Sequence, residues 1–259
     1  MKPPTCVTLP LGLSRCEVQF EAKMKITYVR WAMTIIEMKG LTIVTDPVFK
    51  MLGFPAAPRE YTIEQLPRPD LILISHRHVD HWDRWTMRRL PKDIPLIVRP
   101  RRIADDARRW GYTQVQELAP WKETRFGEAS ITAVPAKHTG TEVGFVLQGA
   151  KTIYFAGDTS FDREIFTSIA QRFALDVALL PIGGLHLFGA SAHIDPPQAV
   201  EALKLLRPDV VIGTHWGCAP SLPPITAMPG TPRELARLLT EAGVDVAVRG
   251  MAPLEPVTI

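Results

Sequence analysis

Short apolar runs rich in valine and isoleucine recur along the chain, and charged residues, prolines and glycines separate them. Runs of this length between turn residues are typical of buried β-strands. The pattern predicts strands at residues 25–38, 41–46, 70–75, 96–99, 129–135, 143–148, 152–156, 176–180, 209–214 and 245–248.

Two helix starts follow the order of capping residue, first-turn proline and polar capping-box partner. They are Asp195 with Pro196 and Gln198, and Thr231 with Pro232 and Glu234. Gly243 is placed to end the second helix. Strands mixed with helices in this order predict sheets packed together with helices outside, in one domain.

Residues 68–76 and 207–215 match position for position, each with Arg-Pro-Asp, an apolar strand and a terminal histidine. Buried strands look alike in general, which explains the valine and isoleucine but not the shared Arg-Pro-Asp and histidine. A weaker match relates residues 41–46 to 152–158. These matches favour two halves derived from one unit. We therefore expect a single domain at residues 24–259, with halves at about 24–140 and 141–259, after an N-terminal arm of residues 1–23.

The composition is that of a folded globular protein, with 46% hydrophobic and 22% charged residues in 259. The formal net charge is only +3, which disfavours a nucleic-acid binder. One basic cluster, interpreted as a solvated helix face, consists of Arg99, Arg101, Arg102, Arg108 and Arg109.

Several features bear on location. Residues 1–23 lack the uninterrupted apolar stretch of a signal peptide. Charges or prolines interrupt every apolar run before the roughly 20 residues that a transmembrane helix needs. Cys6, Cys16 and Cys218 are too few and too unevenly spaced for a disulfide framework. We expect a cytoplasmic protein without a transmembrane segment, and the sequence carries no signal for its oligomeric state.

The strongest chemical signal is the segment Ser75-His76-Arg77-His78-Val79-Asp80-His81-Trp82-Asp83, directly after a predicted strand. In an extended chain the spacing of two directs His76 and His78 to the same side, while Asp80 and His81 can face a second ion. A polar surface loop is the alternative, but three histidines close together are unexpected in a chain with only 7. The segment indicates a site for two metal ions.

This segment resembles the His-x-His-x-Asp-His motif of the metallo-β-lactamase superfamily, and the later family landmarks follow in order. They are Pro135-Ala136-Lys137-His138, Ala156-Gly157-Asp158-Thr159 and Gly213-Thr214-His215-Trp216-Gly217. From about Lys25 onward, the resemblance implies an α/β (α+β) fold, an αββα sandwich of two mixed β-sheets flanked by helices. The implied ligands are His76, His78 and His138 for one metal, Asp80, His81 and His215 for the other, and Asp158 as the bridge.

Imidazole and carboxylate ligands suit Zn²⁺, which we expect first, and also Mn²⁺ or Fe²⁺. Two ions about 3.5 to 4 Å apart bind a bridging water and lower its pKa, so that the expected nucleophile is a metal-bound hydroxide. For Asp158 in an isolated Gly-Asp-Thr, a helix N-cap after a strand is a plausible alternative. Its place in the ordered series of motifs favours the ligand role.

Other polar residues have competing interpretations. The resemblance implies that Asp46 orients metal ligands, whereas a turn residue before a proline is as good an explanation. Asp83 is expected to cap a helix. His193 is a candidate catalytic residue, together with Asp80, because it lies just before the Asp195 cap and can position substrate or donate a proton; alternatively it ties down its own loop. His186 and the apolar loops at 184–188 and 51–55 either wall a pocket or belong to the core.

Within the superfamily, the chain resembles the group that contains N-acyl-phosphatidylethanolamine phospholipase D and the ascorbate-6-phosphate lactonase. The motifs are Thr45-Asp46-Pro47-Val48-Phe49, Leu180-Pro181-Ile182-Gly183 and His193-Ile194-Asp195-Pro196-Pro197-Gln198-Ala199-Val200. Two motifs depart from the group, which often has Gly-His at Arg30-Trp31 and acidic residues at Pro197-Gln198. His78 stands where the diiron flavoprotein oxidoreductases carry glutamate, which favours hydrolysis over redox chemistry.

These observations predict a dinuclear metal-dependent hydrolase that cleaves a phosphodiester in a small-molecule or lipid-like substrate. The first alternative is a lactonase or amidase that directs the same hydroxide at a carbonyl. The second is a non-catalytic metal-binding scaffold. Activity on phosphodiesters and lactones discriminates between the two enzymes, and turnover of neither favours the scaffold.

Overall fold

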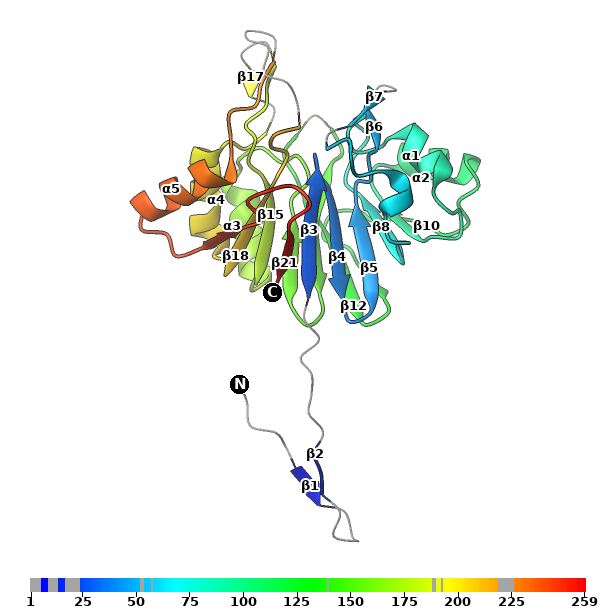
Figure 1. Ribbon diagram of the computed structural model, residues 1–259, viewed down its shortest axis with the longest axis horizontal. Helices are drawn as coiled ribbons and strands as arrows, with labels where there is room; N and C mark the ends of the chain where they lie inside the picture. Colours follow the sequence, from blue (N-terminus) through cyan, green and yellow to red (C-terminus); the bar gives the residue numbers. More distant parts are fainter. Residues whose placement is uncertain are drawn as a thin grey trace.

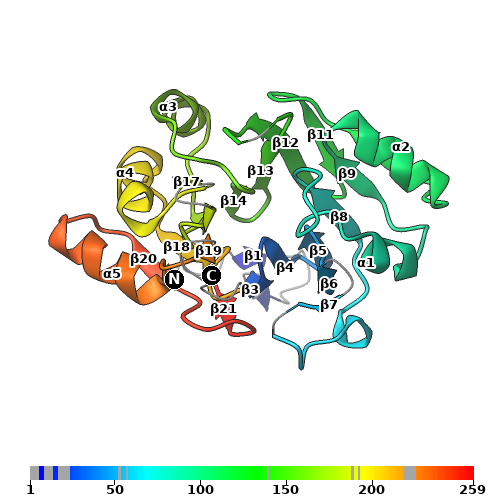
Figure 2. The ribbon, with the colours of Figure 1, turned by 90° about the horizontal axis from the view of Figure 1, so that it is seen from above.

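Two seven-stranded β-sheets face one another and form the centre of the protein, with helices on their outer sides (Figure 1). The structure is a computed structural model and describes residues 6–8, 14–16, 24–51, 54–56, 58–138, 140–187, 190–191, 193–218 and 226–259. Seen from above, α3, α4 and α5 lie on one side of the sheets and α1 and α2 on the other (Figure 2). This arrangement confirms the predicted αββα sandwich.

The first sheet is mixed. Its strands, in spatial order, are β10 (Val115–Glu117), β9 (Leu96–Val98), β8 (Leu71–Ile74), β5 (Leu41–Thr45), β4 (Met33–Met38), β3 (Lys25–Arg30) and β21 (Pro256–Thr258). The strands from β10 to β5 are parallel to one another, whereas β4, β3 and β21 pair antiparallel.

The second sheet is also mixed. Its strands, in spatial order, are β11 (Glu123–Phe126), β12 (Ala129–Pro135), β13 (Val143–Gln148), β14 (Thr152–Phe155), β15 (Val177–Pro181), β18 (Val210–Thr214) and β20 (Ala247–Arg249). The strands from β11 to β14 form an antiparallel meander, and the strands from β14 to β20 are parallel.

Short strands form smaller sheets outside this sandwich. They are β1 (Cys6–Thr8) with β2 (Ser14–Cys16), β6 (Lys50–Met51) with β7 (Phe54–Pro55), and β16 (His186–Leu187) between β17 (Ala190–Ser191) and β19 (Thr226–Ala227). A 3-10 turn also lies at Ile63–Gln65.

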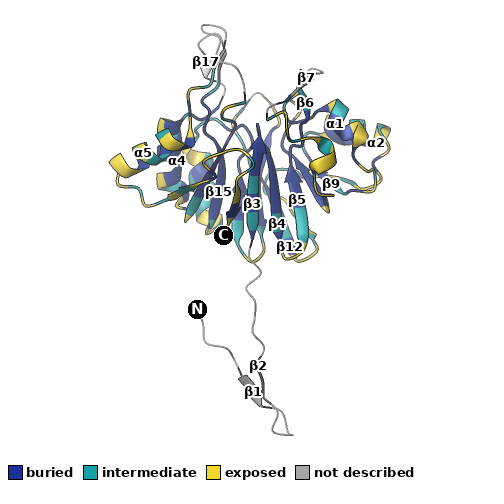
Figure 3. Ribbon diagram, in the orientation of Figure 1, coloured by how far each residue is buried: buried dark blue, intermediate teal, exposed yellow. Residues whose placement is uncertain are grey.

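Alternation along the strands divides the core into layers, because successive side chains of a strand point to opposite faces. Phe145 and Leu147 of β13 point between the sheets, whereas Val146 points toward the helices on the outer side. The same division separates Phe155 from Tyr154 in β14. Figure 3 shows the resulting distribution, with buried residues along the central strands and exposed residues on the outer surfaces of the helices.

The helices cover the outer faces of the sheets. They are α1 (Arg84–Arg89), α2 (Arg101–Arg109), α3 (Arg163–Arg172), α4 (Pro196–Leu206) and α5 (Pro232–Glu241). Asp195 and Thr231 accept hydrogen bonds from the amides of Gln198 and Glu234, so both predicted caps are confirmed. Gly243 follows the end of α5 with φ +62°, as expected for a glycine that ends a helix. Among the described residues, no helix is long and apolar enough to cross a membrane.

One predicted strand is wrong. Residues 25–38 form not one strand but the antiparallel pair β3 and β4, because Trp31 adopts φ +48° and reverses the chain. A tryptophan in this conformation carries no turn signal, since glycine or asparagine is the usual residue there. The other predicted strands are confirmed to within one or two residues at their ends.

Replacing Phe145 by alanine is expected to lower the free energy of unfolding by about 3 to 5 kcal/mol, because the ring is fully buried between the sheets. Chemical denaturation measures the change. Glu123→Ala on the exposed edge strand β11 is the control and should change stability by less than about 0.5 kcal/mol. A loss below about 1 kcal/mol for Phe145→Ala would contradict the packing described.

Candidate metal centre

The candidate residues gather at one edge of the sandwich because the strands that precede them end there. Asp46 follows β5 and His76 follows β8, and these strands are parallel neighbours in the first sheet. In the second sheet, His138, Asp158 and His215 follow β12, β14 and β18, which run in the same direction as one another. The carboxyl ends of such strands are common ligand sites in α/β proteins.

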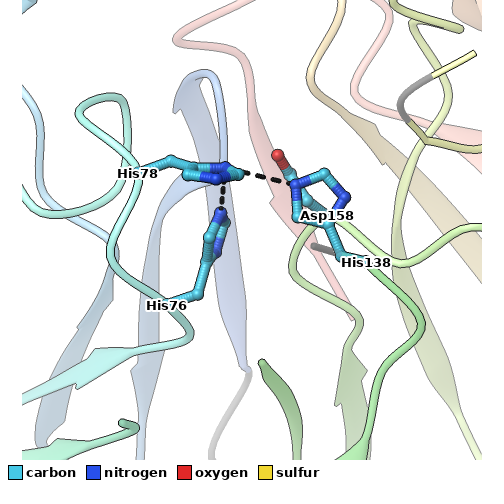
Figure 4. Close-up of side chains that lie close together, drawn as sticks. All are labelled: His76, His78, His138 and Asp158. Carbon is cyan, nitrogen blue, oxygen red and sulfur yellow. Dashed lines mark hydrogen bonds between the residues drawn. The ribbon is translucent and has the colours of Figure 1, made fainter. Parts of the chain in front are cut away.

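The first donor set consists of His76, His78, His138 and Asp158, whose donor atoms lie within 4.8 Å of one another. Nδ1 of His78 is 2.9 Å from Nε2 of His76 and 3.2 Å from Nε2 of His138. Figure 4 shows these side chains converging from three separate segments of the chain. The sequence-predicted residues of the first site are therefore brought together.

The second donor set consists of Asp80, His81, Asp158 and His215. The Nε2 atoms of His81 and His215 are 3.1 Å apart. Oδ2 of Asp158 is 3.1 Å from His81 Nε2, and Oδ1 of Asp158 is 3.0 Å from His215 Nε2. Asp158 thus belongs to both sets, and Asp80 is more distant, with Oδ2 at 3.6 Å from His215 Nε2.

The spacing of the nitrogens fits divalent metal ions. Donors on a tetrahedral zinc ion at about 2.0 to 2.1 Å lie about 3.3 Å from one another. The observed separations of 2.9 to 3.2 Å between imidazole nitrogens are close to this value. Imidazole nitrogens and carboxylate oxygens that converge in this way are the donors that divalent metal ions prefer, so the residues present fit metal binding.

Opposite charges in the second set shift the pKa values of His81 and Asp158. Burial alone lowers the pKa of His81, but the carboxylates of Asp158, Asp80 and Asp46 outweigh burial and raise this pKa well above its usual value. Burial alone raises the pKa of Asp158, but His215 and His81 hold it well below the usual range. Asp158 is therefore a carboxylate, the form that binds a metal ion.

Asp46 fixes the orientation of His81. Its Oδ2 lies 2.7 Å from His81 Nδ1, which leaves Nε2 of that ring facing the second donor set. The carboxylate is completely buried and also accepts hydrogen bonds from the amide and the hydroxyl of Ser75. A carboxylate behind a histidine ligand fixes the tautomer and raises the basicity of the ring. The role that the resemblance implied for Asp46 agrees with these contacts.

Glu142 takes the corresponding position behind His76, and sequence reasoning missed it. Its Oε1 lies 3.3 Å from His76 Nδ1 and accepts a hydrogen bond of 2.8 Å from the amide of Asp158. The side chain is buried, and burial together with the charge of Asp158 raises its pKa well above the usual value. A single acidic residue just before a predicted strand is a weak signal, although Glu142 and His138 lie in the same connection between β12 and β13.

The glycine before Asp158 permits this close contact. Gly157 has φ +61°, and a Cβ atom there would lie 3.1 Å from Ser75 Cβ and 3.2 Å from Glu142 Oε1. A larger residue would strain the backbone and crowd both groups. The Gly-Asp motif thus allows the chain at Asp158 to pack closely against Ser75 and Glu142.

The turn at Trp31 fixes the position of His215. Its carbonyl accepts a hydrogen bond of 2.7 Å from the amide of His215, and its ring contacts the His215 ring edge-on with centroids 5.2 Å apart. The amide of Trp31 in turn lies 3.0 Å from Sγ of Cys218. His215 itself has φ +55°, so this network maintains an uncommon backbone conformation.

Arg30 organises the loop beside the site. It is almost fully buried and donates hydrogen bonds to the carbonyls of Ala56, Pro58 and Tyr61. Both residues of the Arg30-Trp31 pair, which departs from the group pattern in sequence, therefore have structural contacts: Arg30 binds the carbonyls of Ala56 and Tyr61, and Trp31 contacts His215.

His193 lies beside the second donor set. Its ring is 1% exposed, and its centroid is 4.7 Å from that of His215 in an edge-on contact. Burial, followed by the nearby His215, lowers its pKa to about 4. The structure thus places His193 against a candidate ligand, at the edge of the site that the sequence predicted.

Two other sequence hypotheses have separate outcomes. Asp83 caps α1 by accepting hydrogen bonds from the amides of Trp85 and Thr86, which confirms the capping interpretation. His186 lies in β16, but its side chain and much of the apolar loops at 184–188 and 51–55 fall outside the described residues. The pocket predicted there stays a prediction.

Comparisons with known proteins agree with the geometry. A profile of the beta-lactamase superfamily domain matches residues 42–216. A UPF0173 metal-dependent hydrolase from Methanopyrus kandleri is 30% identical over 245 residues, or 90% of this chain and 98% of that protein. A mitochondrial N-acyl-phosphatidylethanolamine-hydrolyzing phospholipase D from Saccharomyces cerevisiae is 31% identical over 206 residues, or 69% of this chain and 44% of that protein.

Solved structures lead to the same family. A metallo hydrolase from Ignicoccus hospitalis has a TM-score of 0.74 and 28% identity, with coverage of 92% of this chain and 98% of that one. Fold, site and relatives together define a metal-dependent hydrolase. Within that class, the chain belongs to the beta-lactamase superfamily, the family that its sequence resembles.

Replacing Glu142 by alanine is expected to weaken zinc binding about 10- to 100-fold, because His76 loses the carboxyl group behind its Nδ1 atom. Glu142→Gln should lose less, since its amide oxygen can still accept the hydrogen bond from Asp158. Competition with a chromophoric chelator measures the affinity. Glu128→Ala removes an exposed carboxylate and is the control. Unchanged affinity in Glu142→Ala would show that the residue does not support the site.

Proposed function

We propose that the protein is a dinuclear metal-dependent hydrolase that cleaves phosphodiester bonds. The observation that carries the proposal is the shared carboxylate of Asp158, which joins two adjacent donor sets into one centre. The phosphodiester preference is supported by the likeness to a relative named as a phospholipase D. We propose zinc as the native metal, with manganese and iron(II) as the alternatives.

In this proposal His76, His78 and His138 hold one ion, Asp80, His81 and His215 hold the other, and Asp158 contacts both. Two such ions activate water as a nucleophile and stabilise charge on a phosphoryl oxygen.

The surrounding side chains keep the ligands in place. Asp46 holds His81 with Nε2 directed into the centre, and Ser75 Oγ and Glu142 lie behind Nδ1 of His76. Because these groups are buried, they contribute orientation without competing with substrate. The chain thus supplies a preorganised centre whose ligands need little rearrangement.

We propose that His193 supports His215, in preference to donating a proton. Its burial and its edge-on contact with the His215 ring favour packing over exposure to substrate. Asp80, which is partly exposed at the centre, is the better placed of the two predicted catalytic residues to contact substrate.

Protein purified without added metal is expected to contain two equivalents of metal and to hydrolyse bis(p-nitrophenyl) phosphate. A chelator should abolish the activity, because the nucleophile and the charge stabilisation depend on the ions. Asp158→Ala should lower kcat/KM at least about a hundredfold. Asp209→Asn serves as the control, because Asp209 is exposed and lies just before β18, at the opposite end of this strand from His215.

The outcomes separate the possible functions. Turnover of lactones with no phosphodiester hydrolysis would replace this proposal by the carbonyl hydrolase. Metal content without turnover of either class would favour the non-catalytic scaffold. Metal content unaffected by replacing His76 and His215 would refute the assigned centre.

His193→Phe keeps an aromatic ring against His215, so we expect it to retain zinc affinity and activity within about threefold. His193→Ala removes the contact and should weaken zinc binding about tenfold, in the range seen for groups behind metal ligands. Chelator competition and steady-state kinetics measure both variants. Equal loss of kcat in the two variants, with zinc binding intact, would instead indicate a polar role of the imidazole in catalysis.

A further inference from the structure

A cleft of about 450 Å³ opens beside the first donor set. The lining includes three histidines, His76, His78 and His138, and three arginines, Arg77, Arg101 and Arg102. A cleft of this volume accommodates a small organic molecule. The only acidic residue in the lining described is Glu142, which is directed to His76 and the Asp158 amide. A substrate bound at the metal centre would therefore share the cleft with three arginines.

These arginines have no hydrogen-bonded carboxylate partner in the described parts of the chain. Arg77 and Arg101 approach Asp106 and Asp105 only to 3.8 and 3.9 Å, which is beyond hydrogen-bonding distance. The same two aspartates also pair with arginines farther along α2.

Arg102 forms no ion pair with any residue in the described parts of the chain. The side chain of Arg101 is 81% exposed. Neither Arg101 nor Arg102 therefore has a carboxylate within hydrogen-bonding distance among the described residues.

The start of α2 adds to this positive potential. Its first turn contains Arg101 and Arg102 but no acidic residue, and Pro100 at the N-cap position provides no side-chain hydrogen bond. Cations near a helix N-terminus are unfavourable, because the exposed amides there already carry partial positive charge. An anion in the cleft would relieve this repulsion, whereas a neutral or cationic group would not.

We infer that the cleft binds a second anionic group of the substrate, a carboxylate or a phosphate, while the reacting group lies at the metal centre. The inference rests on the proposed function, and it names the substrate class as molecules with two anionic groups. Guanidinium groups bind carboxylate and phosphate with paired, charge-assisted hydrogen bonds, so the lining matches this chemistry.

Matched pairs of ligands test the inference on the metal-loaded protein. Phosphonoacetate, 3-phosphonopropionate and 4-phosphonobutyrate carry a phosphonate for the metals and a carboxylate for the arginines. Ethyl-, propyl- and butylphosphonate have the same numbers of carbon atoms and lack the carboxylate oxygens. Isothermal titration gives a Kd for each, and at one or more chain lengths the carboxylate should improve binding about tenfold or more.

Variants locate the effect. The double variant Arg101→Ser/Arg102→Ser should reduce the ratio of the two Kd values to near one. The control Arg163→Ser/Arg233→Ser removes the same charge from the first turns of α3 and α5, where both arginines are exposed. The control should preserve the ratio. Because each ratio compares two ligands on one protein, a general change in metal content cancels.

Three outcomes would overturn the inference: a ratio near one at every chain length in the unmodified protein, a ratio that survives in the double variant, and an equal loss in the control. Failure of the proposed function is recognised separately, because bis(p-nitrophenyl) phosphate has a single anionic group and its hydrolysis does not require the arginines. If the protein does not hydrolyse this compound but shows the arginine-dependent ratio of Kd values, the inferred anion site stands and the proposed phosphodiester hydrolysis is refuted.

Discussion

The contact of one buried carboxylate with two histidines constrains the rest of the structure. Asp158 approaches His81 and His215 through different oxygens, and these histidines follow strands of different sheets. The two sheets must therefore meet with a fixed offset, or one oxygen would lose its partner. Since a buried carboxylate without partners is costly, the interior of the sandwich and the metal centre depend on the same alignment.

A layer of supporting groups transmits that alignment to the ligands. Asp46 and Glu142 lie behind His81 and His76, and the Trp31 carbonyl holds the backbone of His215. These contacts come from β5, β13 and the β3–β4 turn, so neighbouring strands orient ligands that they do not carry. Core packing between the sheets thus contributes to ligand geometry, which explains how a rigid scaffold can preorganise a centre built largely on loops.

The sequence predicted most of the fold and the assembled donor sets, because those signals are local. A strand shows in its composition, and the histidine motif is compact enough to stand out. The supporting role of Glu142 could not be predicted, because one acidic residue before a strand is not a distinctive pattern and its contact with His76 is visible only in the structure. The turn at Trp31 was hidden because its conformation is imposed by packing against His215 and not by a turn residue. The predicted duplication of two halves stays a prediction, although β8 and β18 do deliver their histidines to the same edge.

Specificity has a different origin from reactivity in this architecture. The donor sets follow strand ends and can serve either phosphoryl or acyl transfer, so they do not select a substrate. Arg101 and Arg102 instead lie on α2, which packs on the outer side of the first sheet and contributes nothing to the donor sets. Because Arg101 and Arg102 are exposed, their charge can vary without disturbing the buried face of α2, and it can define which molecules enter the cleft. A cluster that in sequence looks like a solvated helix face therefore gains a functional meaning only from its position beside His78 and His138.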